Sequence, residues 1–133
     1  MTFSPEDAYI PPMPESDHPE VENHEPSESD FAAVSQEIDM YEESAKIALG
    51  SGDVGAFQAA YLASLEASIR LGELSLQRYA AQESNGTGLL PEAREKSIAD
   101  THQRIAEYKE RMELVAKDPN TFISTSGLHN YLP

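Results

Sequence analysis

Histidine is the residue type in this chain best suited to acid–base or metal chemistry, and its spacing forms no recognisable site. The four histidines are His18, His24, His102 and His129. Glu15 precedes His18 by three positions, but bundle metal sites need that spacing inside facing helices, and this pair lies in a proline-rich segment. Ala99 holds the corresponding position before His102, which is therefore interpreted as a surface or edge histidine. We predict no metal site.

Nucleophilic and phosphate-binding patterns are missing from the sequence as well. The chain has no cysteine, so it offers no thiol nucleophile, thiolate metal ligand or disulfide. No Gly-x-Ser-x-Gly elbow occurs, and no grouping of Ser, His and acid can be assembled from the spacing. The glycine-rich stretches at 50–52 and 85–88 follow helical patterns and not strands, unlike phosphate loops. We expect a protein that is not an enzyme and has no cofactor.

The charge is strongly acidic and unevenly distributed. The net charge is −15, from 24 acidic and 9 basic residues. Residues 1–30 hold nine of the acids and no Lys or Arg, which leaves a net of −6 for the remainder. Because phosphate backbones and anionic lipids attract basic side chains, this balance disfavours direct nucleic-acid binding and adsorption to membranes. With no run of about 18 apolar residues, no membrane insertion is expected either.

One long helix is expected at the centre of the fold, over residues 53–84. Its apolar positions cover most of the circumference, and only a narrow polar stripe interrupts them: Glu66, Arg70, Glu73 and Gln77. An alanine-rich side would allow a neighbouring helix to approach closely. Gly72, which costs about 1 kcal/mol relative to Ala within a helix, is interpreted as the point of a close helix crossing.

Two further helices flank this one in the sequence, at about residues 30–49 and 91–117. Apolar residues recur in both at three-four spacing, with Ser27 or Ser29 as the first cap, Asp53 as the second, and Pro91 in a first turn. The short connections predict antiparallel neighbours. The fold class is therefore all-α, an antiparallel three-helix bundle over residues 29–117 with coiled-coil-like packing.

The two ends of the chain differ in composition. Residues 1–28 are acidic and rich in proline, which predicts a disordered tail. Residues 118–133 are apolar and almost uncharged, which predicts an irregular tail that either folds back on the bundle or binds a partner.

The predicted helix lengths do not match, and this mismatch suggests a binding surface. A central helix of about 46 Å is longer than a first helix of about 30 Å, so an apolar strip is expected to stay uncovered at its far half. The expected partner-binding residues are Leu65, Ile69, Leu76, Tyr79, Phe122, Ile123, Leu128, Tyr131 and Leu132.

The leading hypothesis is a non-enzymatic helical protein–protein interaction module. It would act as an oligomer or as a subunit or adaptor of a larger assembly, of the secretion-system or virion accessory type. The alternative is an acidic nucleic-acid mimic that inhibits a DNA- or RNA-binding protein, using an acidic surface of Glu37, Asp39, Glu42 and Glu43. A cytoplasmic location is the default, and non-classical secretion or incorporation into a particle stays open.

Overall fold

A computed structural model describes residues 25–133, and this part of the chain is built from helices alone. The elements are α2 (Glu28–Gly50), α3 (Val54–Asn85), α4 (Pro91–Lys117), α5 (Pro119–Thr125) and the 3₁₀ helix η2 (Leu128–Tyr131). The three long helices begin and end within two residues of the predicted bounds. The predicted disordered tail, 1–28, lies outside the described residues except for its last few positions.

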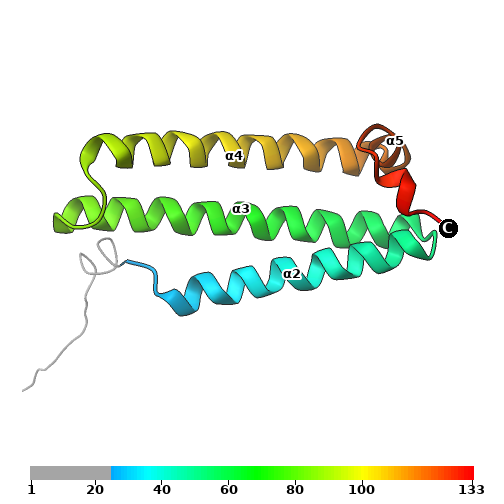
Figure 1. Cartoon of the computed structure of the whole chain (residues 1–133), viewed down its shortest axis with the longest axis horizontal. Coiled ribbons are helices and arrows are strands. Elements are labelled where there is room, and N and C mark those ends of the chain that lie inside the picture. Colours follow the sequence, from blue (N-terminus) through cyan, green and yellow to red (C-terminus); the bar gives the residue numbers. More distant parts are fainter. Residues whose placement is uncertain (1–24) are drawn as a thin grey trace, which may run out of the picture.

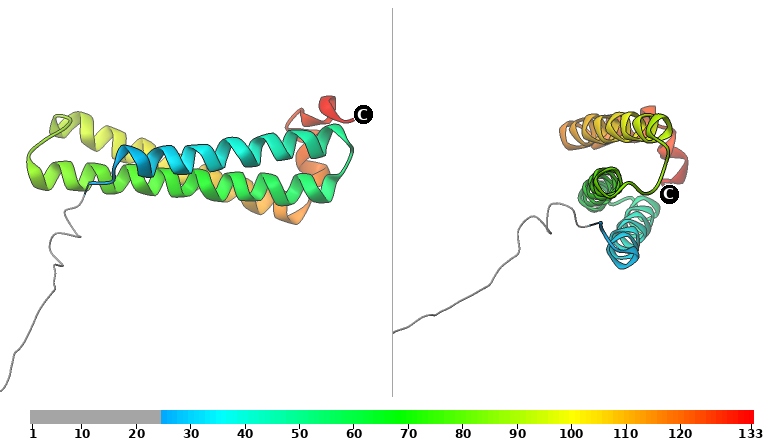
Figure 2. Two further views of the ribbon diagram at one scale, coloured as in Figure 1. Left: turned by 90° about the horizontal axis from the view of Figure 1, so that it is seen from below. Right: turned by 90° about the vertical axis from the view of Figure 1, so that its left-hand side faces the viewer.

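The predicted antiparallel three-helix bundle is confirmed, with α3 as its central member. Figure 1 shows α3 between α4 and α2, and the end-on view in Figure 2 shows the same order. Both outer helices pack extensively on α3 but have no extensive contact with each other. The three helices therefore form an open arrangement, which leaves one end to be filled by the C-terminal segment.

Local caps and a positive-φ glycine fix the start of α2, the turn after it and the start of α3. Ser27 and Asp30 form a capping box, in which the Ser27 hydroxyl accepts from the Asp30 amide and the Asp30 carboxylate accepts from the Ser27 amide. Gly52 takes a positive φ of 78° just after α2, where a side chain would be strained. Asp53 then accepts a hydrogen bond from the Ala56 amide, as predicted for the α3 cap.

Ion pairs connect the first half of α2 to the second half of α3. Arg70 donates to both carboxylate oxygens of Glu37, at 2.8 and 3.4 Å. Nearer the far end of α3, Arg78 donates to Glu28 at 3.0 Å, and its guanidinium carbon lies 4.0 Å from the centre of the Phe31 ring. The expectation that the first helix leaves the far half of the central one uncovered is therefore wrong. The helix begins two residues earlier than predicted and reaches Arg78.

The interface between α3 and α4 depends on a close approach at Gly72. A Cβ built at Gly72 would lie 2.8 Å from Cγ1 and 3.0 Å from Cδ1 of Ile105. This confirms the interpretation of Gly72 as a helix crossing. One turn from the start of α3, the Gln58 amide donates to the carbonyls of Val115 and Ala116, at 3.0 and 3.2 Å. These carbonyls belong to the last turn of α4, which lacks internal donors.

The C-terminal segment folds back on the bundle and is more regular than expected. Asp118 caps α5 by accepting from the amide and the hydroxyl of Thr121, at 3.2 and 2.7 Å. Gly127, at a φ of 83°, then turns the chain into η2. Because α4 runs antiparallel to α3, this segment arrives beside the start of α3 (Figure 1). The segment therefore covers the start of α3, whereas the comparison of helix lengths predicts an uncovered strip on its far half.

Candidate partner-binding site

A cavity of about 500 Å³ opens where the second half of α2, the start of α3 and η2 meet. Its walls come from three segments that are distant in sequence: Glu42, Ala45, Lys46, Leu49 and Gly50 from α2, Phe57 and Tyr61 from α3, and Leu128 and Tyr131 from η2. Most of these side chains are apolar. Cavities of this size and character commonly accept small molecules or a partner's side chain.

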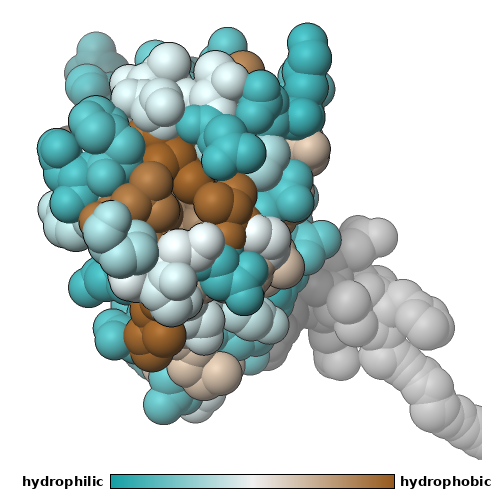
Figure 3. All heavy atoms as spheres, turned by 90° about the vertical axis from the view of Figure 1, so that its right-hand side faces the viewer, coloured by the Kyte–Doolittle hydropathy of each residue, from teal (hydrophilic) through white to brown (hydrophobic). Residues whose placement is uncertain are grey.

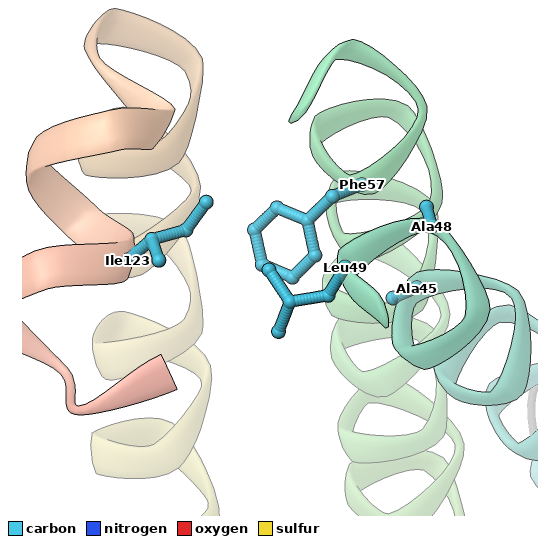
Figure 4. Packing of buried hydrophobic residues seen from close by; sticks show 5 residues of the cluster. All are labelled: Ala45, Ala48, Leu49, Phe57 and Ile123. Carbon is cyan, nitrogen blue, oxygen red and sulfur yellow. The ribbon is translucent and has the colours of Figure 1, made fainter. Parts of the chain in front are cut away.

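The floor of the cavity is rigid because it belongs to the hydrophobic core. Phe57 is buried, and it packs in one cluster with Ala45, Leu49 and Ile123. Figure 4 shows Ile123 of α5 directed toward Phe57 and Leu49 across the gap between the helices. The ring of Phe57 also stacks on Tyr61, with centroids 5.3 Å apart. This packing fixes the position of the rings that face the cavity.

Phe122 extends the aromatic stack and ties α5 to α3. Its ring centre lies 5.3 Å from that of Tyr61, with the planes tilted by 40°. Aromatic contacts of this kind contribute about 0.5–1.5 kcal/mol beyond area burial. The cavity thus depends on the docking of the C-terminal segment, without which it would have no η2 wall.

The rim of the cavity combines exposed apolar and charged side chains. Tyr131 is 68% exposed although it lines the cavity. From α2, Glu42 and Lys46 line the opening, and the exposed carboxylates Asp39 and Glu43 lie within one turn of Glu42. Figure 3 views the end of the bundle that carries the C-terminal segment and shows hydrophobic atoms surrounded by hydrophilic ones. The charge beside the opening is predominantly negative.

The site residues predicted on the central helix do not form an exposed strip. Leu65 is only 3% exposed, so its assignment to a binding surface is corrected. Ile69, Leu76 and Tyr79 are half-buried. The physical reason is that α4 packs on α3, with Ile105 against Gly72, on the side of α3 where helical spacing also places these residues.

The site residues predicted in the C-terminal segment divide into buried and accessible ones. Ile123 is 2% exposed and belongs to the core, which corrects its assignment as a partner contact. Phe122 is half-buried against Tyr61. Leu128 and Tyr131 line the cavity. Leu132 follows Tyr131 in the sequence and is partly exposed. Two of the nine predicted contacts therefore lie on the cavity itself.

Sequence reasoning misses the α2 and α3 walls of the cavity. Ala45, Leu49, Phe57 and Tyr61 fit bundle-facing positions, because their three-four spacing is typical of a helix packed on a neighbour. The signal in the sequence that could have located these walls is the direction in which the third helix runs. A third helix of 27 residues returns the chain to the start of α3, where two aromatic residues lie one turn apart.

The predicted acidic surface separates into one structural residue and three accessible ones. Glu37 is engaged by Arg70, and the hydrogen bond from Arg70 lowers the pKa of Glu37 below its ordinary value against a smaller opposing effect of desolvation. Asp39, Glu42 and Glu43 are exposed, and within residues 25–133 they form no ion pair. These three carboxylates are called the acidic ridge below.

A metal centre and a membrane-spanning helix are two other features that would indicate a function. No group of three or more His, Asp or Glu side chains within residues 25–133 lies close enough to hold a metal ion. Among the helices described, none combines the length and the apolar character that crossing a membrane requires. No family model matches the chain, and no curated protein or solved structure shows a match to it.

Proposed function

We propose that the protein is a non-enzymatic helical interaction module, acting as an oligomer or as a subunit or adaptor of a larger assembly. The observation that carries this proposal is the open apolar cavity between α2, α3 and η2. Three segments meet there, yet their side chains do not fill the space. A partner that inserts an apolar side chain would bury the exposed parts of Tyr61, Leu128 and Tyr131.

The exposure of Tyr131 supports the same proposal. Interfaces are enriched in tyrosine because its ring offers a large contact area and its hydroxyl stays compatible with water. Tyr131 lies on the rim of the cavity with most of its side chain accessible. A partner seated in the cavity would cover it.

Site-specific photo-crosslinking in cells that naturally make the protein tests the proposal. A photoreactive phenylalanine analogue replaces Tyr131 in one variant and Leu90 in a control. Leu90 is 77% exposed and apolar but immediately precedes α4, whose start lies at the other end of the bundle from α5 (Figure 1). The proposal predicts a discrete adduct from position 131 and none of that mass from position 90. The adduct's mass separates a second copy from a different protein.

A lack of any discrete adduct at position 131, or the same adducts at both positions, contradicts the proposal. Circular dichroism of both variants confirms that each is still helical. Since both replaced side chains are exposed, the substitutions should leave the fold intact.

The alternative, an acidic mimic of nucleic acid, stays a weaker proposal. A mimic needs carboxylates arrayed over a rigid surface, and Glu37 is already neutralised by Arg70. The acidic ridge retains only three carboxylates, and Lys46 lies one turn away from Glu42. Binding to a basic partner that is unaffected by removing the apolar cavity side chains would favour the mimic.

A further inference from the structure

We infer that the occupant of the cavity is a basic peptide segment of a partner protein, which inserts one bulky apolar side chain and places Lys or Arg on the acidic ridge. This inference rests on the proposed function, because it takes the cavity as the binding site and specifies its ligand. It is carried by two independent features: the size of the cavity, and the charge beside its opening.

The cavity is large enough to receive a bulky apolar side chain. A volume of about 500 Å³ is near the lower end of the range for ligand pockets. One aromatic side chain fits in this volume, and the mostly apolar walls favour such a side chain over a polar one. The aromatic and aliphatic walls, Phe57, Tyr61 and Leu128, would surround such a side chain on three sides.

The charge beside the opening selects a basic flank for that side chain. Asp39, Glu42 and Glu43 lie within five consecutive residues of α2, which is about 6 Å along the helix axis. All three are exposed, and Glu42 itself lines the cavity. Lys46 is the basic residue on the rim, so the carboxylates outnumber it. A partner with Lys or Arg one turn from its apolar side chain would reach these carboxylates.

The same charge argues against two other occupants. A second copy of the chain would bring its own acidic ridge to the interface, and residues 31–133 of each copy carry a net charge of −6. Like charges brought together at an interface oppose binding. An uncharged apolar molecule would use the cavity walls but gain nothing from the three carboxylates. Both alternatives give distinct results in the experiment below.

The test uses the full-length chain and three synthetic peptides, the second and third of which each change one kind of residue in the first. The first carries one tryptophan flanked by lysines on an alanine background. The second replaces the tryptophan with alanine and carries an end-attached dye, and the third replaces every lysine with glutamate. The chain contains no tryptophan, so tryptophan emission reports on the first and third peptides alone. Backbone amide NMR spectra of the protein locate the bound peptide.

The expected result is binding of the basic tryptophan peptide, with amide shifts confined to the cavity residues and the acidic ridge. Loss of the tryptophan should weaken binding about tenfold or more, as for a central interface residue. The double variant Glu42→Gln/Glu43→Gln should weaken it about fivefold, and added salt should reduce the difference. The matched control, Glu92→Gln/Glu95→Gln, removes two exposed carboxylates from α4 at the other end and should leave affinity unchanged.

Each other outcome overturns the inference in a recognisable way. Equal binding of the lysine and glutamate peptides at the cavity would contradict the basic flank of the ligand, but it would not contradict the proposed function. Equal weakening by both carboxylate pairs indicates general charge attraction and not the ridge. A protein that dimerises through the cavity in light scattering makes a second copy the occupant. If no peptide shifts the cavity amides and crosslinking at Tyr131 also fails, the proposed function fails with the inference.

Discussion

Substituting alanine for Gly72 is predicted to destabilise the bundle, although alanine is the better helix former. The gain in helix propensity is about 1 kcal/mol. Against it, the new Cβ would lie 2.8 Å from Cγ1 and 3.0 Å from Cδ1 of Ile105, which is buried. Overpacking of this kind costs about 1–3 kcal/mol. The net expectation is a loss of about 1 kcal/mol in the free energy of unfolding.

A double-mutant cycle with Ile105→Ala isolates this contact. Ile105→Ala alone should cost about 2–5 kcal/mol, since it leaves a cavity opposite Gly72. In the double variant the methyl group introduced at position 72 occupies part of that space without a clash. The cost of Gly72→Ala should therefore disappear, with a coupling energy of about 1–2 kcal/mol. Urea denaturation followed by helical circular dichroism gives all four stabilities.

Gly55→Ala is the matched control within α3. A Cβ at Gly55 meets only the Asp53 carboxylate, at an ordinary 3.8 Å. Gly55→Ala should therefore be neutral or stabilising. If Gly72→Ala stabilises the protein as much as Gly55→Ala does, and shows no coupling to Ile105, the close crossing of α3 and α4 is refuted.

Three further predictions concern the C-terminal segment and the α2–α3 hairpin. Asp118→Ala removes the cap of α5 and should lower the free energy of unfolding by about 1 kcal/mol. Amide hydrogen exchange should become faster in α5 and stay unchanged in the middle of α3. Unchanged exchange at Thr121 would contradict the cap. Phe57→Ala should cost about 3–5 kcal/mol in urea denaturation, and a loss under about 1 kcal/mol would contradict its place in the core. Pairing with Arg70 lowers the pKa of Glu37 from 4.5. The loss of unfolding free energy in Glu37→Gln should therefore reach its full value above about pH 5 and shrink as the pH falls through the lowered pKa. A loss that does not depend on pH would contradict the ion pair.

The three long helices follow directly from local sequence signals. Apolar residues at three-four spacing, together with caps such as Ser27 and Asp53, act within a few residues and need no tertiary information. The role of Gly72 is also predictable, because a glycine inside a strong helix pattern usually has a packing reason. These features agree with the structure because local preference and tertiary packing favour the same conformation.

The position of the cavity is not predictable in the same way, because it depends on where distant segments meet. The assignment of Leu65 to an exposed strip comes from a comparison of two helix lengths, which ignores the cover that α4 provides. The assignment of Ile123 to a partner contact fails because a short apolar tail carries no sign of which end of the bundle it reaches. Only the antiparallel path of α4 places it against Phe57.

An amide hydrogen-exchange footprint tests whether the open cavity is the partner-binding surface. Exchange in the intact chain is measured with and without a saturating amount of the partner that crosslinking at Tyr131 identifies. If the adduct is a second copy, exchange is instead compared at high and low concentrations of the protein itself. Partner binding at the cavity predicts slower exchange over residues 42–50 and 128–131 and unchanged exchange over residues 85–95 at the opposite end. Protection confined to residues 85–95, or to the acidic ridge without η2, would contradict it.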